Sequence, residues 1–221
     1  MSESIPEDLV MDTPVLQVRW RLQNNALPLL NRHLRAFAQR GVSRGLQSWA
    51  RQHLEWTLAE GSLGDPNGVL TIDVDEAGRS VMGIEPFVEL EPLTVPLMAE
   101  RVQQQAQNPV ESEVMWVAQE SRLTALSSPS KPLSGVNSLV CDLAKTLKAT
   151  VEFDESLLTA CLQDPGVISP DSQVFLASDE YGIVPAVGHD GDICKQYASY
   201  YARIVGLAHA DAYDKANLGL R

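Results

Sequence analysis

One short segment carries side chains that could bind a metal ion. His189-Asp190-Gly191-Asp192 places one imidazole and two carboxylates within four residues, and both groups are common metal ligands. An Asp-Gly step is also typical of tight turns, and no further ligand for such a site can be identified elsewhere in the sequence. We therefore interpret the segment as a hairpin turn or a strand-to-helix turn and predict no metal site.

The other nucleophilic and titratable side chains favour structural roles. Cys141, Cys161 and Cys194 have neither C-x-x-C nor zinc-ligand spacing, which indicates reduced, partly buried thiols. His33 and His53 fall in helical patterns without H-E-x-x-H spacing, so we expect packing or surface residues. The sequence contains no G-x-G-x-x-G or G-x-x-x-x-G-K-[ST] motif. These residues therefore indicate no catalytic group.

Composition and charge narrow the possible partners. The chain has 221 residues, of which 44% are hydrophobic and 21% charged, as is typical of a globular protein with a sizeable core. Its net charge of -12 repels phosphate backbones and anionic membranes. The acidic N-terminus lacks the features of a secretory signal, and no apolar run approaches the roughly 18 residues that span a bilayer. We expect a cytoplasmic protein that binds neither nucleic acid nor membranes.

The first part of the chain has the pattern of a small α+β domain. The expected elements are a strand at 15–20, helices at 27–37 and 46–58, and hairpin strands at 69–74 and 80–84. Two prolines in Glu91-Pro92-Leu93-Thr94-Val95-Pro96 indicate a linker. We therefore place one domain at residues 1–92 and a second at residues 97–221.

The second part alternates strands and helices. The expected elements are a helix at 97–107, a strand at 112–117, a helix from 136, a strand at 151–153, a helix at 155–162, strands at 174–176 and 183–187, and a helix at 193–205. The clearest is the helix after Gly135, because its apolar residues recur at i, i+3, i+4, i+7, i+8 and i+11. Gly206 is expected to end the last helix.

The order and spacing of the segments between Ser112 and Val187 resemble a known family. Ser112-Glu113-Val114-Met115-Trp116-Val117, Leu133-Ser134-Gly135-Val136-Asn137 and the strand pair around Ala177-Ser178-Asp179-Glu180-Tyr181-Gly182 resemble S-N-[VI]-F-x-V, L-x-G-[VI]-T-R and F-L-T-G-T-x-x-G-[VI]-x-P-V. These patterns belong to the class IV, fold-type IV pyridoxal phosphate (PLP) enzymes, which include D-amino-acid aminotransferases and aminodeoxychorismate lyase. The resemblance implies a two-domain α+β fold of the D-amino-acid aminotransferase type, with a shortened C-terminal domain.

The resemblance also implies where a cofactor phosphate would lie. The matching cofactor-binding positions are Gly135, Val136, Asn137, Ser178 and Asp179. The family's threonine at the helix start is replaced by Asn137, and Asp179 and Glu180 would bring negative charge close to the phosphate. Two like charges at about 4 Å repel by roughly 1 kcal/mol in water and by several at an effective dielectric near 20. We therefore do not expect a phosphate to be held at these positions.

The residues that carry the family's chemistry are missing as well. PLP catalysis needs a lysine amine, which in this family precedes the strand matched by 112–117, whereas this sequence has no lysine before Lys131. The family's arginine in L-x-x-H-L-x-R-L falls on Ala36, and Arg35 points about 100° away around the helix. We predict no catalytic residue, with Lys131 as the only replacement we considered.

These expectations combine into one hypothesis and two alternatives. The leading hypothesis is a divergent class IV-like protein without PLP catalysis, which binds a small ligand or a protein partner through its interdomain cleft. The resemblance implies a homodimer. The first alternative is an active aminodeoxychorismate lyase or aminotransferase with PLP as its cofactor. The second is an unrelated α+β fold.

Overall fold

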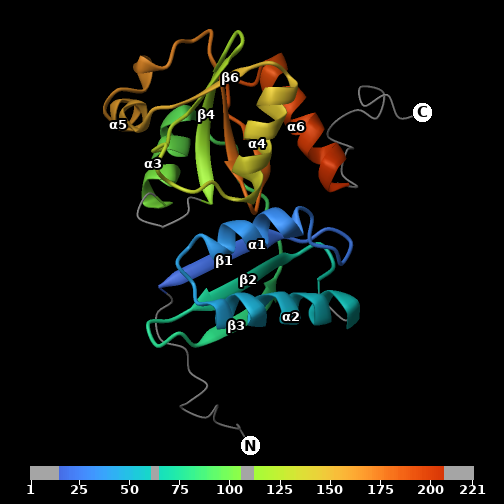
Figure 1. Cartoon of the computed structure of the whole chain (residues 1–221). Coiled ribbons are helices and arrows are strands. Elements are labelled where there is room, and N and C mark those ends of the chain that lie inside the picture. The colour runs from blue at the N-terminus through green and yellow to red at the C-terminus, as the bar shows by residue number, and fades with distance from the viewer. Residues whose placement is uncertain (1–14, 61–64, 106–111, 207–221) are drawn as a thin grey trace, which may run out of the picture.

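Two β-sheets organise the chain (Figure 1). The computed structural model describes residues 15–60, 65–105 and 112–206. The elements are β1 (Leu16–Arg21), α1 (Leu30–Ala38), α2 (Arg44–Glu60), β2 (Val69–Val74), β3 (Ser80–Glu85), α3 (Val95–Gln105), β4 (Glu113–Gln119), β5 (Arg122–Ala125), α4 (Gly135–Thr146), β6 (Thr150–Phe153), α5 (Glu155–Gln163), the 3-10 helix η2 (Pro165–Val167), β7 (Gln173–Ser178), β8 (Gly182–Pro185) and α6 (Asp192–Val205).

The first lobe is an antiparallel sheet of order β1-β2-β3 with α1 and α2 on one face. Residues of β1 alternate, as a half-buried strand requires: Val18 and Trp20 enter the core, where Phe37 of α1 and Leu54 of α2 also lie. The intervening Arg19 takes no part in that core and instead reaches the second lobe through its ion pair with Glu180. The first strand therefore supplies both packing and lobe-to-lobe contacts.

The second lobe is a five-stranded sheet of order β6-β5-β4-β7-β8, in which β5 and β6 are parallel and the other pairs antiparallel. Helices α4 and α6 cover one face and α3 and α5 the other (Figure 1). Successive residues of β4 enter different cores: Val114 and Trp116 pack towards α4, and Met115 and Val117 towards α3. A strand covered on both faces reads as a continuous apolar run, as this one does.

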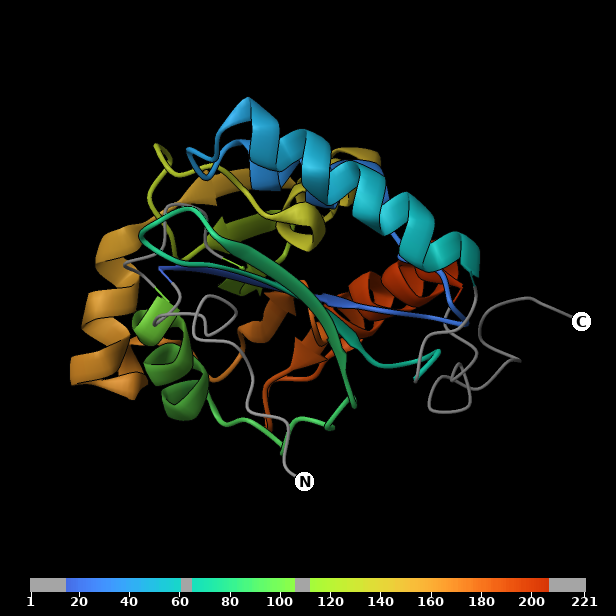
Figure 2. The same cartoon turned by 90° about the horizontal axis from the view of Figure 1, so that it is seen from below.

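Direct contacts join the two lobes. The Arg32 guanidinium of α1 donates to Ser138 Oγ at 3.0 Å and to Asp142 Oδ2 at 2.8 Å, both on α4. The Arg21 amide of β1 donates to the Asp179 carbonyl at 3.2 Å. Because of these contacts, the start of α4 and the loop after β7 lie where the two lobes meet. Seen from below, α2 runs along one edge of the molecule (Figure 2).

Most expected elements are present with shifted ends. The last helix stops at Gly206, whose φ of 65° is left-handed, as expected. The short strand β5 was not expected, because it has only four residues and Leu123 is its one large apolar side chain. The expected helix end at 106–107 lies outside the described residues. Among the helices that the structure describes, none has the length and apolar character needed to cross a membrane.

Candidate functional site

A buried carboxylate occupies the N-terminus of α4. Asp179 Oδ1 accepts hydrogen bonds from the Val136 amide at 2.8 Å and from Ser134 Oγ at 2.9 Å. Free amides and the helix dipole favour an anion at such a terminus. Ser134, the N-cap residue, makes no capping bond with its own side chain. Asp179, which follows β7 and is 2% exposed, therefore supplies the anion from another part of the chain.

His33 of α1 closes this helix start from the side of the first lobe. Its Nδ1 lies 3.5 Å from Asp179 Oδ2, and both side chains are almost fully buried. The imidazole stacks on Trp20 at a centroid distance of 5.1 Å. A Cβ atom at Gly135 would lie 2.5 Å from His33 Nδ1, so only glycine allows the helix start to approach the ring this closely. The two lobes therefore meet without a gap at this point.

The electrostatics favour an ionised Asp179. Burial alone would raise the pKa of Asp179, but the nearby His33 and the hydrogen bonds from Val136 and Ser134 outweigh it and lower this pKa. Arg40, on the loop after α1, is also buried and acts on Asp179 through its charge. The carboxylate is thus held by the donors of Val136 and Ser134, with the charge of Arg40 nearby.

Asn137 has a structural role in the same network. Its Oδ1 accepts from Trp116 Nε1 at 2.8 Å, and its Nδ2 donates to Ser134 Oγ at 2.9 Å and to the Ala177 carbonyl at 3.3 Å. The side chain therefore joins β4, β7 and the start of α4. Both the oxygen and the nitrogen of its amide are thus bonded within the protein itself.

A second group of polar residues lines a cavity of about 350 Å³ between the lobes. We call it the interlobe cleft, and its lining residues are Val15, Gln17, Arg19, Arg101, Gln105, Ser112, Glu113, Ser178, Glu180 and Tyr181. Of the five positions matched to the cofactor, only Ser178 lines it. The cleft and the start of α4 are therefore separate, although the loop 178–181 contributes to both.

Two arginine–glutamate pairs dominate the interlobe cleft. Arg19 binds Glu180 with N–O distances of 2.6 and 3.0 Å and Glu85 at 2.7 Å. Arg101 of α3 binds the buried Glu113 at 2.6 and 2.7 Å. Burial would lower the pKa of Arg101, but Glu113 outweighs it and raises that pKa. Glu180 and Glu113 each accept two hydrogen bonds from one guanidinium group, which is the geometry of a strong charge-assisted interaction.

Replacing Arg101 with glutamine is expected to lower the free energy of unfolding by about 2 kcal/mol, because it leaves Glu113 buried without its cation. The control is Arg122→Gln, which removes an arginine whose pair with Glu152 spans 4.0 Å and is half exposed on both sides, so a change under about 0.5 kcal/mol is expected. Urea denaturation of both variants measures the difference. Equal effects would contradict the structural role of the Arg101 pair.

The structure separates the predicted site residues into two groups. Gly135, Val136, Asn137 and Asp179 meet at the start of α4, whereas Ser178 Oγ donates to Glu113 Oε1 at 3.1 Å on the side of the interlobe cleft. Ser178 is the last residue of β7 and Asp179 the first of the turn that follows, and their side chains go to different sites. The sequence did not indicate the roles of Ser134, the N-cap of α4 itself, or of His33, Arg19 and Arg101, which meet these residues from other elements. The alternation of Arg19 with Val18 and Trp20 was the one signal that could have indicated a role for Arg19 outside the core.

The segment His189-Asp190-Gly191-Asp192 joins β8 to α6 as a turn. His189 Nδ1 lies 2.7 Å from the Ser172 carbonyl oxygen. A Cβ at Gly191 would meet the Gln173 side chain, whose Oε1 accepts from the Ile193 amide at the helix start. Within the described residues, no three histidine, cysteine, aspartate or glutamate side chains are grouped as metal ligands. The three cysteines are free.

Comparisons with known proteins give a likeness of fold. No protein-family model matches this sequence, and no curated protein matches it. Among solved structures, 4-amino-4-deoxychorismate lyase from Pseudomonas aeruginosa is similar with a TM-score of 0.55 and 13% identity, over 85% of this chain and 90% of that one. A putative amino-acid aminotransferase from Mesorhizobium loti gives a TM-score of 0.46 and 10% identity, over 78% of this chain and 97% of that one. The α+β fold expected from the resemblance is therefore confirmed, and an unrelated fold is excluded.

Proposed function

We propose that this chain is a ligand-binding or interaction protein on a class IV aminotransferase-like fold, and that it does not carry out PLP chemistry. Residues 1–92 and 97–221 would form its two domains. The observation that carries the proposal is the buried Asp179 carboxylate, which accepts the Val136 amide at the start of α4. That position is the one that the family resemblance assigns to the cofactor phosphate.

The residues at the start of α4 do not fit a cofactor phosphate. The amide that would bind it is already bonded to Asp179 Oδ1, and the His33 ring lies against Gly135. A phosphate dianion would have to displace both side chains or approach a buried carboxylate, whose repulsion at an effective dielectric near 20 is about 4 kcal/mol per unit charge at 4 Å. No step of a reaction is therefore assigned to PLP here.

The lysines of the chain support the same proposal. The five are Lys131, Lys145, Lys148, Lys195 and Lys215, and all follow β4. Lys145 is 75% exposed and pairs with Asp142 on the surface of α4. Lys131 lies in the loop between β5 and α4. It is the lysine to test as a replacement for the catalytic lysine of the class IV enzymes.

The interlobe cleft is the proposed ligand site. Its volume of about 350 Å³ is at the small end of ligand pockets, so it suits a small molecule. The cleft offers two guanidinium groups, two carboxylates and the Tyr181 hydroxyl. This balance of charge favours a small polar ligand that carries both a carboxylate and an amino group, because such a ligand can exchange with the existing ion pairs. We further propose a homodimer, as the resemblance implies, and a cytoplasmic location, as the composition indicates. Sedimentation of the purified protein tests the dimer.

An absorbance titration with PLP distinguishes the proposal from its alternative, an active aminodeoxychorismate lyase or aminotransferase. We expect no saturable aldimine absorbance, because no lysine is positioned by the family pattern and the phosphate position is filled. Borohydride reduction followed by peptide mass analysis is expected to show no adduct beyond scattered, substoichiometric labelling of exposed lysines.

A stoichiometric adduct on a single lysine would overturn the proposal. The Lys131→Ala variant is the matched control, since loss of such an adduct in that variant alone would assign the enzyme alternative to Lys131. An adduct that persists in Lys131→Ala would assign it to another lysine.

A further inference from the structure

The positive charge of this acidic protein is concentrated in one part of the sequence. Between Thr13 and Leu54 there are seven arginines and no aspartate or glutamate, whereas the chain as a whole carries a net charge of -12. Four of these arginines already have partners or are buried: Arg19 and Arg32 in ion pairs, Arg21 over the Phe87 ring at 3.2 Å, and Arg40 in the interior. Their side chains are therefore already engaged within the protein.

The other three arginines are exposed on α1 and α2. Arg35 extends from α1, and Arg44 and Arg51 from α2. Within the described part of the chain, the side chains of these three residues form no hydrogen bond or ion pair. Exposed arginines in a protein with an excess of acids can readily pair with carboxylates, so three without an ion pair give this surface a local positive charge.

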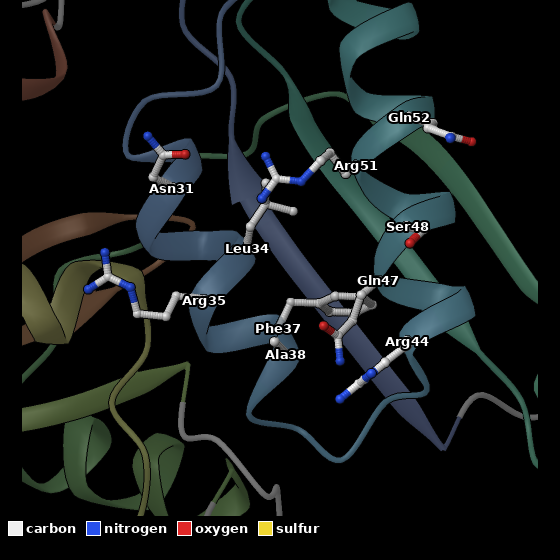
Figure 3. Close-up of a pocket in the computed structure, with 10 residues that line it drawn as sticks. All are labelled: Asn31, Leu34, Arg35, Phe37, Ala38, Arg44, Gln47, Ser48, Arg51 and Gln52. Atoms are coloured by element: carbon white, nitrogen blue, oxygen red, sulfur yellow. The ribbon is translucent and has the colours of Figure 1, made fainter.

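These three arginines line a groove between α1 and α2 with a cavity of about 830 Å³, which we call the arginine groove. Asn31, Gln47 and Gln52 add hydrogen-bonding groups, and Leu34 contributes apolar lining. In Figure 3, Arg51 reaches from α2 towards Leu34, Arg44 lies at the start of α2, and Arg35 extends from the side of α1 that faces away from α2. They do not converge on one point.

The geometry selects among anionic ligands. A compact anion such as a phosphate is bound by donors that converge on it, which these arginines do not provide. Single-stranded nucleic acid is bound by exposed aromatic rings that stack on bases, but Phe37, the one aromatic residue in the lining, is 1% exposed. Spaced cations with amide side chains and some apolar surface between them fit an extended chain with spaced carboxylates.

We propose that the arginine groove binds an acidic peptide segment of a partner protein. The carboxylates of the segment pair with Arg35, Arg44 and Arg51, and its apolar side chains lie against the Leu34 side of α1. Because the groove lies between α1 and α2 and shares no lining residue with the interlobe cleft, this inference does not depend on the proposed ligand site.

Fluorescence anisotropy tests the inference on the full-length protein. The probe is a short labelled peptide in which glutamates alternate with leucines, and the control peptide has glutamine in place of glutamate. We expect saturable binding of the acidic peptide that weakens with added salt. The triple variant Arg35→Gln, Arg44→Gln, Arg51→Gln is expected to bind about tenfold more weakly, because each exposed pair contributes a small amount.

Arg203→Gln is the matched control variant, since it removes an exposed arginine of α6 and is expected to leave binding unchanged. The inference would be overturned if the triple variant bound as well as the wild type while remaining folded. Equal binding of the neutral peptide would overturn it too. Tighter binding of an oligonucleotide or of inorganic phosphate than of the acidic peptide would assign the groove to a phosphate ligand instead.

Discussion

Replacing Asp179 with alanine is expected to lower the free energy of unfolding by about 3 kcal/mol, the largest loss we expect from any single carboxylate in the chain. The carboxylate accepts two hydrogen bonds at the start of α4, and a hydrogen bond to a charged group contributes about 1.5–3 kcal/mol. The substitution also leaves His33 and the Val136 amide buried without their anion. Chemical denaturation monitored by circular dichroism gives the measurement.

Asp154→Ala is the matched control for this prediction. Asp154 also accepts a helix-start amide, that of Leu157 at 3.1 Å, but it is exposed and caps its own helix α5. Loss of such a cap costs about 1 kcal/mol. Equal losses of unfolding free energy in the two variants would show that the buried contact of Asp179 with α4 contributes no more to stability than an exposed helix cap.

The same carboxylate sets a pH dependence. Its folded-state pKa is lowered from the ordinary 3.8, so the stability it contributes is present above about pH 4 and is lost as the pH falls through the folded-state pKa. The wild type should therefore lose more unfolding free energy than Asp179→Ala between neutral pH and about pH 3. Parallel curves for the two proteins would contradict an ionised Asp179.

Several features of the fold could be predicted from the sequence because their cause is local. The apolar stripe of α4 and the glycine after α6 follow from periodicity and backbone freedom within one element. The resemblance also predicted that Asp179 and Val136 are neighbours, because it matches both to one phosphate site. No local pattern could have done so, since the two residues are 43 positions apart. Sequence reasoning treated the carboxylate as an obstacle to a phosphate, and the structure shows it as the helix's own anion.

The contacts made by His33, Arg19 and Arg101 could not be predicted in this way. Each depends on how two lobes or two distant elements pack, and a single side chain in a periodic pattern does not indicate its partner. His33 was expected to be a packing or surface residue, and it is indeed buried against Trp20. Its proximity to Asp179 arises only when α1 lies against the start of α4.

The turn after β7 holds both Asp179 and Glu180, and Gly182 fixes its shape. Gly182 has a φ of 76°, and a Cβ atom there would overlap the buried Tyr201 ring of α6. Gly182→Ala is therefore expected to lower the free energy of unfolding by about 3 kcal/mol, of which roughly 1 kcal/mol comes from the left-handed backbone and the rest from overpacking. Thermal and urea unfolding measure the loss.

Gly188→Ala separates the two causes, because Gly188 has a φ of 80° and a Cβ atom there would meet nothing within 4 Å. This substitution should lower the free energy of unfolding by about 1 kcal/mol, the cost of the left-handed backbone conformation alone. In the Gly182→Ala background, Tyr201→Leu should cost less than it does in the wild type, since removing the ring relieves the overlap. Additive effects would mean that the ring does not restrain the turn, and the placement of Asp179 and Glu180 would then depend on their ion pairs and hydrogen bonds alone.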